Sequence, residues 1–127
     1  PTSQETMQRI LTSLLFCAAA SIASAQGQDY YPEETAAMRA SVEKHVTQVD
    51  AAVQLNQDQR AKVAAAYMHV EMELAAVNHR FDQSNYTPDE RAREMNAQWQ
   101  AMEKALDFQL KDALTGTQYE KWAELAK

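Results

Sequence analysis

The sequence predicts an all-α protein in which a long antiparallel helical hairpin is flanked by shorter helices. Glycine occurs only at Gly27 and Gly116, whereas the helix-favouring residues Ala, Glu, Gln, Lys and Met are plentiful. Apolar residues recur at spacings of three and four along much of the chain, which is the period of one helix face. A short phrase consisting of Leu, a capping residue, two variable residues and Gln occurs twice, and each copy is typical of a helix start.

Residues 1–25 are predicted to contain a cleaved signal peptide that starts at Met7. Arg9 supplies the positive start, an apolar segment follows at 10–20, and a small-residue cleavage site ends at Ala25. The apolar segment is too short for a membrane-spanning helix, which needs about 20 residues. The residues before Met7 are interpreted as upstream sequence. We therefore expect export to the periplasm, with secretion as the second choice.

The only cysteine, Cys17, lies inside this predicted leader. A lipoprotein site takes a small residue before its cysteine, and Phe16 occupies that position, which argues against lipidation. Cleavage would remove Cys17, so the exported chain is predicted to form no disulfide.

The remainder of the chain is long enough for one domain. We expect a flexible N-terminal arm at 26–32, because this segment is polar and without period, and a single helical domain at 33–127. The net charge is −6, and loss of Glu5 and Arg9 with the leader leaves it unchanged. Such an acidic chain lacks the basic surface of a nucleic-acid binder, so no nucleic-acid partner is expected.

The first helix is predicted to begin around Pro32 and the acidic pair Glu33 and Glu34, because negative charge is favoured at a helix N-terminus. Its end is expected near Gln54. One narrow apolar stripe follows its length at spacings of three and four: Met38, Val42, Val46, Val49 and Val53.

The second and third helices are predicted to form the hairpin. A helix over 57–82 carries apolar pairs at a seven-residue repeat, which favours a long partner helix: Val63 and Tyr67, Val70 and Leu74, Val77 and Phe81. A short polar break at 82–86 implies an antiparallel return. Thr87, Pro88 and Glu90 then form a strong start signal. The third helix should end near Ala113, with an apolar side made of Met95, Trp99, Met102, Leu106, Leu110 and Ala113.

The repeated phrase is found at 55–59 and 114–118. The capping residues are Asn56 and Thr115, and the glutamines stand at the third helical position, where each can reach back to its cap. The leucines before the caps can pack as hydrophobic staples. The structural motif residues are therefore Leu55, Asn56, Gln59, Leu114, Thr115 and Gln118. An alternative interpretation is that two ordinary capping boxes coincide. The second copy starts a short fourth helix with Tyr119, Trp122 and Leu125 on one side.

No catalytic arrangement is present in the sequence, and we predict neither an enzyme nor a cofactor. Ser41 and Ser84 have no evident base, and no glycine-rich phosphate loop occurs. His69 and Glu73 lie one helical turn apart and are weak metal-ligand candidates. Because neither His45 nor His79 lies on that face, solvated histidines are the favoured interpretation and no metal site is predicted.

Candidate client-binding residues are Met68, Met72 and Phe108, which lie beside the predicted apolar faces. Flexible, polarizable Met side chains on a half-exposed face suit binding to varied apolar partners. A wider core or a dimer contact is the alternative for each residue. A thin hairpin buries little apolar surface alone, so a homodimer is expected.

The two phrases resemble the motif of the Spy/CpxP family of small periplasmic helical proteins, named for Leu-Thr-x-x-Gln. Residues 114–118 match it fully, and 55–59 match with Asn56 in place of Thr. The resemblance extends to the layout of signal peptide, hairpin and short last helix. It implies a dimeric, curved cradle and an ATP-independent chaperone or envelope-stress protein. The best-known chaperone of that family is strongly basic, whereas this chain is acidic, which shifts weight toward apolar client contacts.

The leading hypothesis is therefore a periplasmic, chaperone-like protein that binds partly unfolded polypeptides weakly and reversibly. The alternative is a metal-responsive or signalling-regulatory domain that acts on a membrane sensor protein. A third hypothesis is a structural helical protein of the envelope.

Overall fold

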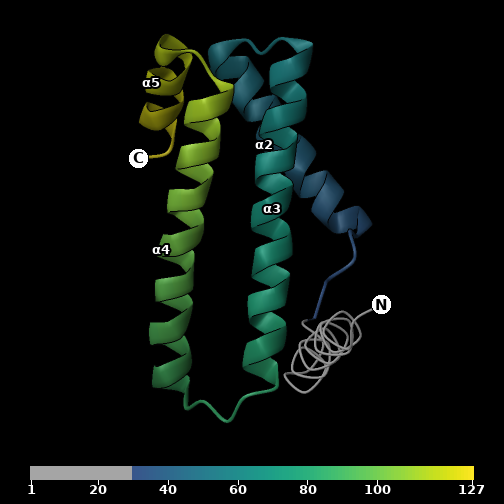
Figure 1. Ribbon diagram of the computed structural model, residues 1–127, viewed down its shortest axis with the longest axis vertical. Coiled ribbons are helices and arrows are strands. Elements are labelled where there is room, and N and C mark those ends of the chain that lie inside the picture. The colour runs from purple at the N-terminus through teal and green to yellow at the C-terminus, as the bar shows by residue number, and fades with distance from the viewer. Residues whose placement is uncertain (1–29) are drawn as a thin grey trace, which may run out of the picture. The chain divides into compact units, whose positions relative to one another are not determined.

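Residues 30–127, which the structure describes, form four helices and no strand. In this computed structural model the helices are α2 (Ala36–Val53), α3 (Gln57–Asp82), α4 (Pro88–Ala113) and α5 (Gly116–Leu125) (Figure 1). The all-α prediction is therefore confirmed. The predicted signal peptide with Cys17, and residues 26–29 of the predicted arm, lie outside the described residues.

Three of the four helices in residues 30–127 start with the capping chemistry that the sequence predicts. Complete capping boxes precede α3, α4 and α5, at Asn56, Thr87 and Thr115. The start of α2 was predicted too early, around Pro32 and the acidic pair. Thr35 is its N-cap, and the Thr35 side chain accepts a hydrogen bond from the Met38 amide at 3.1 Å. A hydroxyl that satisfies a first-turn amide fixes the start more strongly than charge alone.

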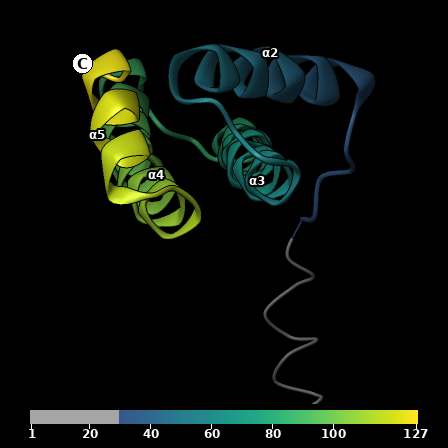
Figure 2. The same cartoon turned by 90° about the horizontal axis from the view of Figure 1, so that it is seen from above.

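The helices form two antiparallel pairings that share α3. Residues 83–87 join α3 to α4, which runs back beside it (Figure 1). Residues 54–56 join α2 to α3, and α2 packs along α3 in the opposite chain direction. Seen from above, α3 lies between α2 and α4 (Figure 2). The short α5 contacts both α2 and α4. None of the helices in residues 30–127 is long and apolar enough to cross a membrane.

The main core lies where all four helices meet. Four valines of the predicted α2 stripe are buried in it, whereas Met38 is only half-buried. The other buried members come from the start of α3, the end of α4 and from α5: Val63, Ala66, Leu110, Leu114 and Trp122. Val63 and Leu110 have no exposed surface, so the chain is fully packed around both of them.

The predicted apolar faces are only partly buried. In α3, Val63, Val77 and Phe81 are buried, but Tyr67, Val70 and Leu74 keep part of their surface exposed. Trp99 and Leu125, predicted on apolar sides, are 44% and 60% exposed. The periodicity of apolar residues identifies the apolar side of a helix, but a residue on that side is buried only where a neighbouring helix packs against it. Trp99 and Leu125 lie instead at the groove described below.

Candidate functional site

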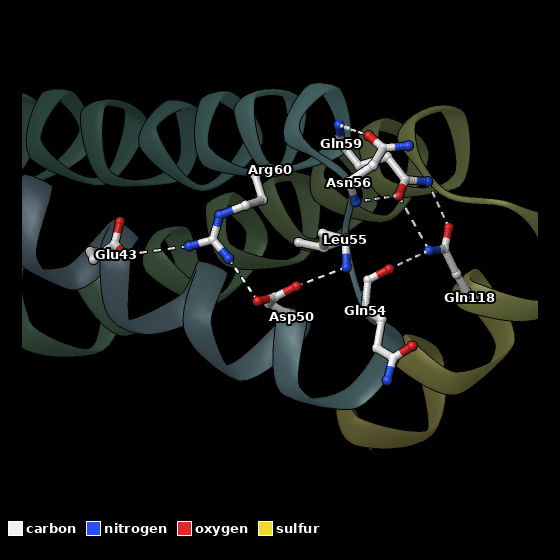
Figure 3. A network of polar contacts seen from close by, with 8 residues as sticks. All are labelled: Glu43, Asp50, Gln54, Leu55, Asn56, Gln59, Arg60 and Gln118. Carbon is white, nitrogen blue, oxygen red and sulfur yellow. Dashed lines mark hydrogen bonds and ion pairs between the residues drawn. The ribbon is translucent and has the colours of Figure 1, made fainter.

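The two motif copies meet in space, because their glutamines bind each other. The Gln59 Nε2 donates to Gln118 Oε1 at 2.7 Å, and the Gln118 Nε2 donates to Gln59 Oε1 at 3.2 Å. Each glutamine oxygen also accepts a hydrogen bond from the backbone amide of its own cap residue. Gln59 accepts from Asn56 at 3.1 Å, and Gln118 accepts from Thr115 at 3.0 Å. Two separate capping boxes are thus joined into one hydrogen-bonded unit. Figure 3 shows Asn56, Gln59 and Gln118 of this unit. We call this unit, Gln59 and Gln118 with their caps, the glutamine clamp.

The glutamine clamp also holds the ends of the two preceding helices, and it does so crosswise. Gln118, at the start of α5, donates from Nε2 to the carbonyls of Val53 at 3.3 Å and Gln54 at 3.0 Å, at the end of α2. Gln59, at the start of α3, donates to the Ala113 carbonyl at the end of α4 at 3.3 Å. Carbonyls at a helix end lack helical partners, so these bonds satisfy groups that otherwise need water. The repeated Gln is therefore architectural.

The motif leucines complete the same corner. Leu114 is buried, and Leu55 is half-buried against the core. The Leu55 amide donates to Asp50 Oδ1 at 2.8 Å, and Asp50 Oδ2 accepts from Arg60 at 2.7 Å. Arg60 also lies 3.6 Å from Glu43 (Figure 3). Gln54 has a positive φ of 57°, so the chain turns sharply between α2 and α3. Asp50 therefore ties this turn to both helices.

Replacing Asp50 with Ala is expected to lower the free energy of unfolding by about 1–2 kcal/mol, because the Leu55 amide and Arg60 both lose their acceptor. Asp50→Asn keeps an acceptor oxygen for the Leu55 amide and should cost only about 0.5 kcal/mol. Urea unfolding followed by circular dichroism measures both values. Equal losses for the two variants would show that the ion pair, and not the turn amide, carries the stabilisation.

A large open groove is lined by residues of all four helices. It has a volume of about 1360 Å³. Its apolar lining includes Val49 of α2, Val70 of α3, Met102 and Leu106 of α4, and Trp122 of α5. We call this feature the four-helix groove.

Aromatic rings organise one wall of the four-helix groove. The imidazole of His45 stacks on Tyr67, with ring centroids 4.6 Å apart and planes 4° from parallel. The Tyr67 hydroxyl accepts a hydrogen bond from Trp122 Nε1 at 3.1 Å. Burial raises the pKa of Tyr67, and the bond from Trp122 opposes that shift. The tyrosine therefore stays neutral at physiological pH and links α2, α3 and α5.

The rim of the groove exposes large apolar side chains. Phe108 is 75% exposed, and Trp99 and Leu125 also retain large exposed surfaces. The Trp99 indole donates to Glu103 at 2.8 Å. The Tyr119 hydroxyl donates to Asp107 at 2.6 Å, and this bond raises the pKa of Tyr119. Aromatic surface beside water and next to a concavity is a common feature of binding sites.

The three predicted client-binding residues are not brought together. Phe108 lies at the four-helix groove. Met68 packs partly against the core, Met72 is half-buried on α3, and neither lines the groove. Tyr67, Trp99 and Trp122 were not predicted to bind a ligand, because each fits a helical apolar stripe. Their position at the groove depends on how α2 and α5 pack against the hairpin of α3 and α4.

The two weak metal-ligand candidates, His69 and Glu73, lie close to each other. His69 Nε2 lies 3.6 Å from Glu73, and His69 Nδ1 is 3.1 Å from the side-chain amide of Gln109. Among residues 30–127, no group of three or more His, Cys, Asp or Glu side chains is placed to hold a metal ion.

Comparison with known proteins finds no matching family model, no matching curated protein and no matching solved structure.

Proposed function

We propose that this protein is an exported, ATP-independent chaperone-like protein that binds partly unfolded polypeptides in the four-helix groove. The observation that carries this proposal is the exposed aromatic rim around an open apolar concavity, with Phe108 and Trp99 at its edge. Unfolded chains expose apolar side chains in varied order, so a wide groove with flexible rim contacts fits them better than a closed pocket.

The proposed binding is weak and reversible. The rim side chains are already in water, and a client would remove only part of their surface from it. Release therefore needs no nucleotide. The predicted leader supports a periplasmic location, where such a holdase or envelope-stress protein would act. We also propose a homodimer, since part of the apolar face of α3 and α4 remains uncovered in one chain.

The purified protein is expected to suppress the aggregation of a chemically denatured client enzyme at several-fold molar excess, measured by light scattering. Phe108→Ala should weaken client binding about 5- to 30-fold, because loss of an aromatic rim contact costs about 1–2 kcal/mol. Since Phe108 is largely exposed, its replacement should leave thermal stability nearly unchanged.

Tyr31→Ala is the matched control, because Tyr31 is 84% exposed and lies away from the groove lining. It should suppress aggregation as the unaltered protein does. Absence of suppression by the unaltered protein would contradict the chaperone function. Equal weakening by both variants would contradict the assignment of that function to the groove.

A further inference from the structure

We infer that the four-helix groove selects polypeptide segments that combine apolar with basic residues. This inference rests on the proposed function and names the class of client. The groove has an apolar lining, but its charged lining residues are mostly acidic. Glu71 of α3 and Glu103 and Asp107 of α4 contribute carboxylates.

Each of these carboxylates is oriented by a neutral hydrogen-bond donor. Glu71 accepts from the Ser41 hydroxyl, Glu103 from the Trp99 indole, and Asp107 from the Tyr119 hydroxyl. Within residues 30–127, none of the three forms an ion pair with a basic side chain of the protein. Neutral donors hold a carboxylate in place without cancelling its charge. The groove therefore presents three fixed negative charges to an incoming ligand.

The basic groups of the lining compensate this charge only in part. Lys104 and Lys127 line the groove, and Lys127 already pairs with Glu124 at 2.9 Å. His45, the remaining titratable base of the lining, is stacked on Tyr67. The surrounding chain adds to the negative potential, because its net charge is −6. A groove with one sign of charge concentrates ligands of the opposite sign.

The size of the groove favours a polypeptide segment as the occupant. Its volume of about 1360 Å³ exceeds that of typical small-molecule sites, which measure about 300–1,000 Å³. The floor offers apolar contacts from Val70, Met102 and Leu106, and the carboxylates lie on the two helices that supply these residues. A segment that places apolar side chains on the floor can therefore direct Lys or Arg toward the acidic groups.

The test uses three labelled peptides with identical apolar residues and length, in which the intervening positions are Lys and Arg, Ser and Gln, or Glu. Both tryptophans of the chain line the groove, so intrinsic fluorescence reports its occupancy while label anisotropy reports binding. The basic peptide is expected to bind at least about tenfold more tightly than the acidic one at low salt, and the ratio should shrink as salt screens the charges.

The triple variant Glu71→Gln, Glu103→Gln and Asp107→Asn should reduce that ratio to about threefold or less, because amide oxygens still accept the three hydrogen bonds while the charges are lost. The matched control is Glu94→Gln, Asp112→Asn and Glu120→Gln, which removes the same charge from exposed positions outside the groove. This control should keep the preference. If the first triple variant unfolds, the exposed Glu103→Gln alone should still lower the ratio measurably.

Several outcomes would overturn this inference. They include equal or tighter binding of the acidic peptide, an equal effect of both triple variants, and binding that leaves tryptophan fluorescence unchanged. If a second copy of the chain covers the groove, the protein would bind none of the peptides. In that case the first triple variant, with Glu71, Glu103 and Asp107 replaced, would change the oligomeric state, and the inference would be overturned. Suppressed client aggregation without peptide preference would overturn the inference and leave the proposed function intact. Absence of both activities would contradict the proposed function itself.

Discussion

Replacing Trp122 with Ala is expected to lower the free energy of unfolding by about 3–5 kcal/mol. Trp122 is 6% exposed and is the buried side chain through which α5 enters the core. The substitution removes this packing and leaves a cavity at the helix junction. It also removes the indole donor of the Tyr67 hydroxyl. Thermal unfolding should show a fall in Tm of at least about 12 °C, at roughly 4 °C or more per kcal/mol for a domain of this size.

Two comparisons separate packing from hydrogen bonding in this experiment. Trp122→Phe keeps much of the buried ring surface and is expected to cost about 1–2 kcal/mol, including the lost indole bond to Tyr67. Trp99→Ala removes the same residue type from a position that is 44% exposed, so it should cost well under half as much as Trp122→Ala. Similar losses at Trp99 and Trp122 would contradict the burial on which the core at the helix junction is built.

Local sequence signals predict the helices well, because capping is decided within a few residues. The side chains of Asn56, Thr87 and Thr115 each accept a hydrogen bond from the backbone amide three residues later. The Gln or Glu side chain at that later position in turn accepts a hydrogen bond from the backbone amide of the cap residue. The one start that was misplaced illustrates the same rule. The acidic pair before Thr35 is compatible with a helix start, because negative charge interacts favourably with the helix N-terminus. The hydroxyl of Thr35, however, accepts a hydrogen bond from a first-turn amide, and this bond sets the start of the helix.

The four-helix groove could not be predicted in the same way, because it arises from tertiary placement. Trp99 and Leu125 fit apolar stripes, yet no neighbouring helix covers them fully. Met68 and Met72 lie off the main stripe of α3, where a binding role was expected, but both are half-buried outside the groove. Phe108 was predicted to lie off the main apolar face of its helix, and it is 75% exposed. Its role in binding stays a prediction.

The glutamine clamp provides the second large expected effect. Gln118→Ala should lower the free energy of unfolding by about 2–3 kcal/mol, because two carbonyls at the end of α2 and the cap of α5 lose their partner together. Gln59→Ala should cost about 1–2 kcal/mol, since Gln59 donates to one carbonyl at a helix end, whereas Gln118 donates to two. Gln57→Ala is the control, because Gln57 is an exposed glutamine at the start of the same helix. It should change stability by less than about 0.5 kcal/mol.

The double variant distinguishes a clamp from two independent caps. If Gln59 and Gln118 act as one unit, the first substitution already breaks their mutual bonds, so the double variant should cost about 1–2 kcal/mol less than the sum of the single losses. Chemical denaturation of the four proteins gives this coupling energy. Strict additivity would favour the alternative that two ordinary capping boxes coincide.

Gln118→Glu separates capping from donation, because it keeps the size of the side chain and the acceptor for Thr115 but replaces the amide donor that faces Val53 and Gln54. We expect a loss at least as large as that of Gln118→Ala, because a carboxylate oxygen cannot donate to these carbonyls and repels them. A much smaller loss would show that capping of α5 alone is what the repeated Gln provides.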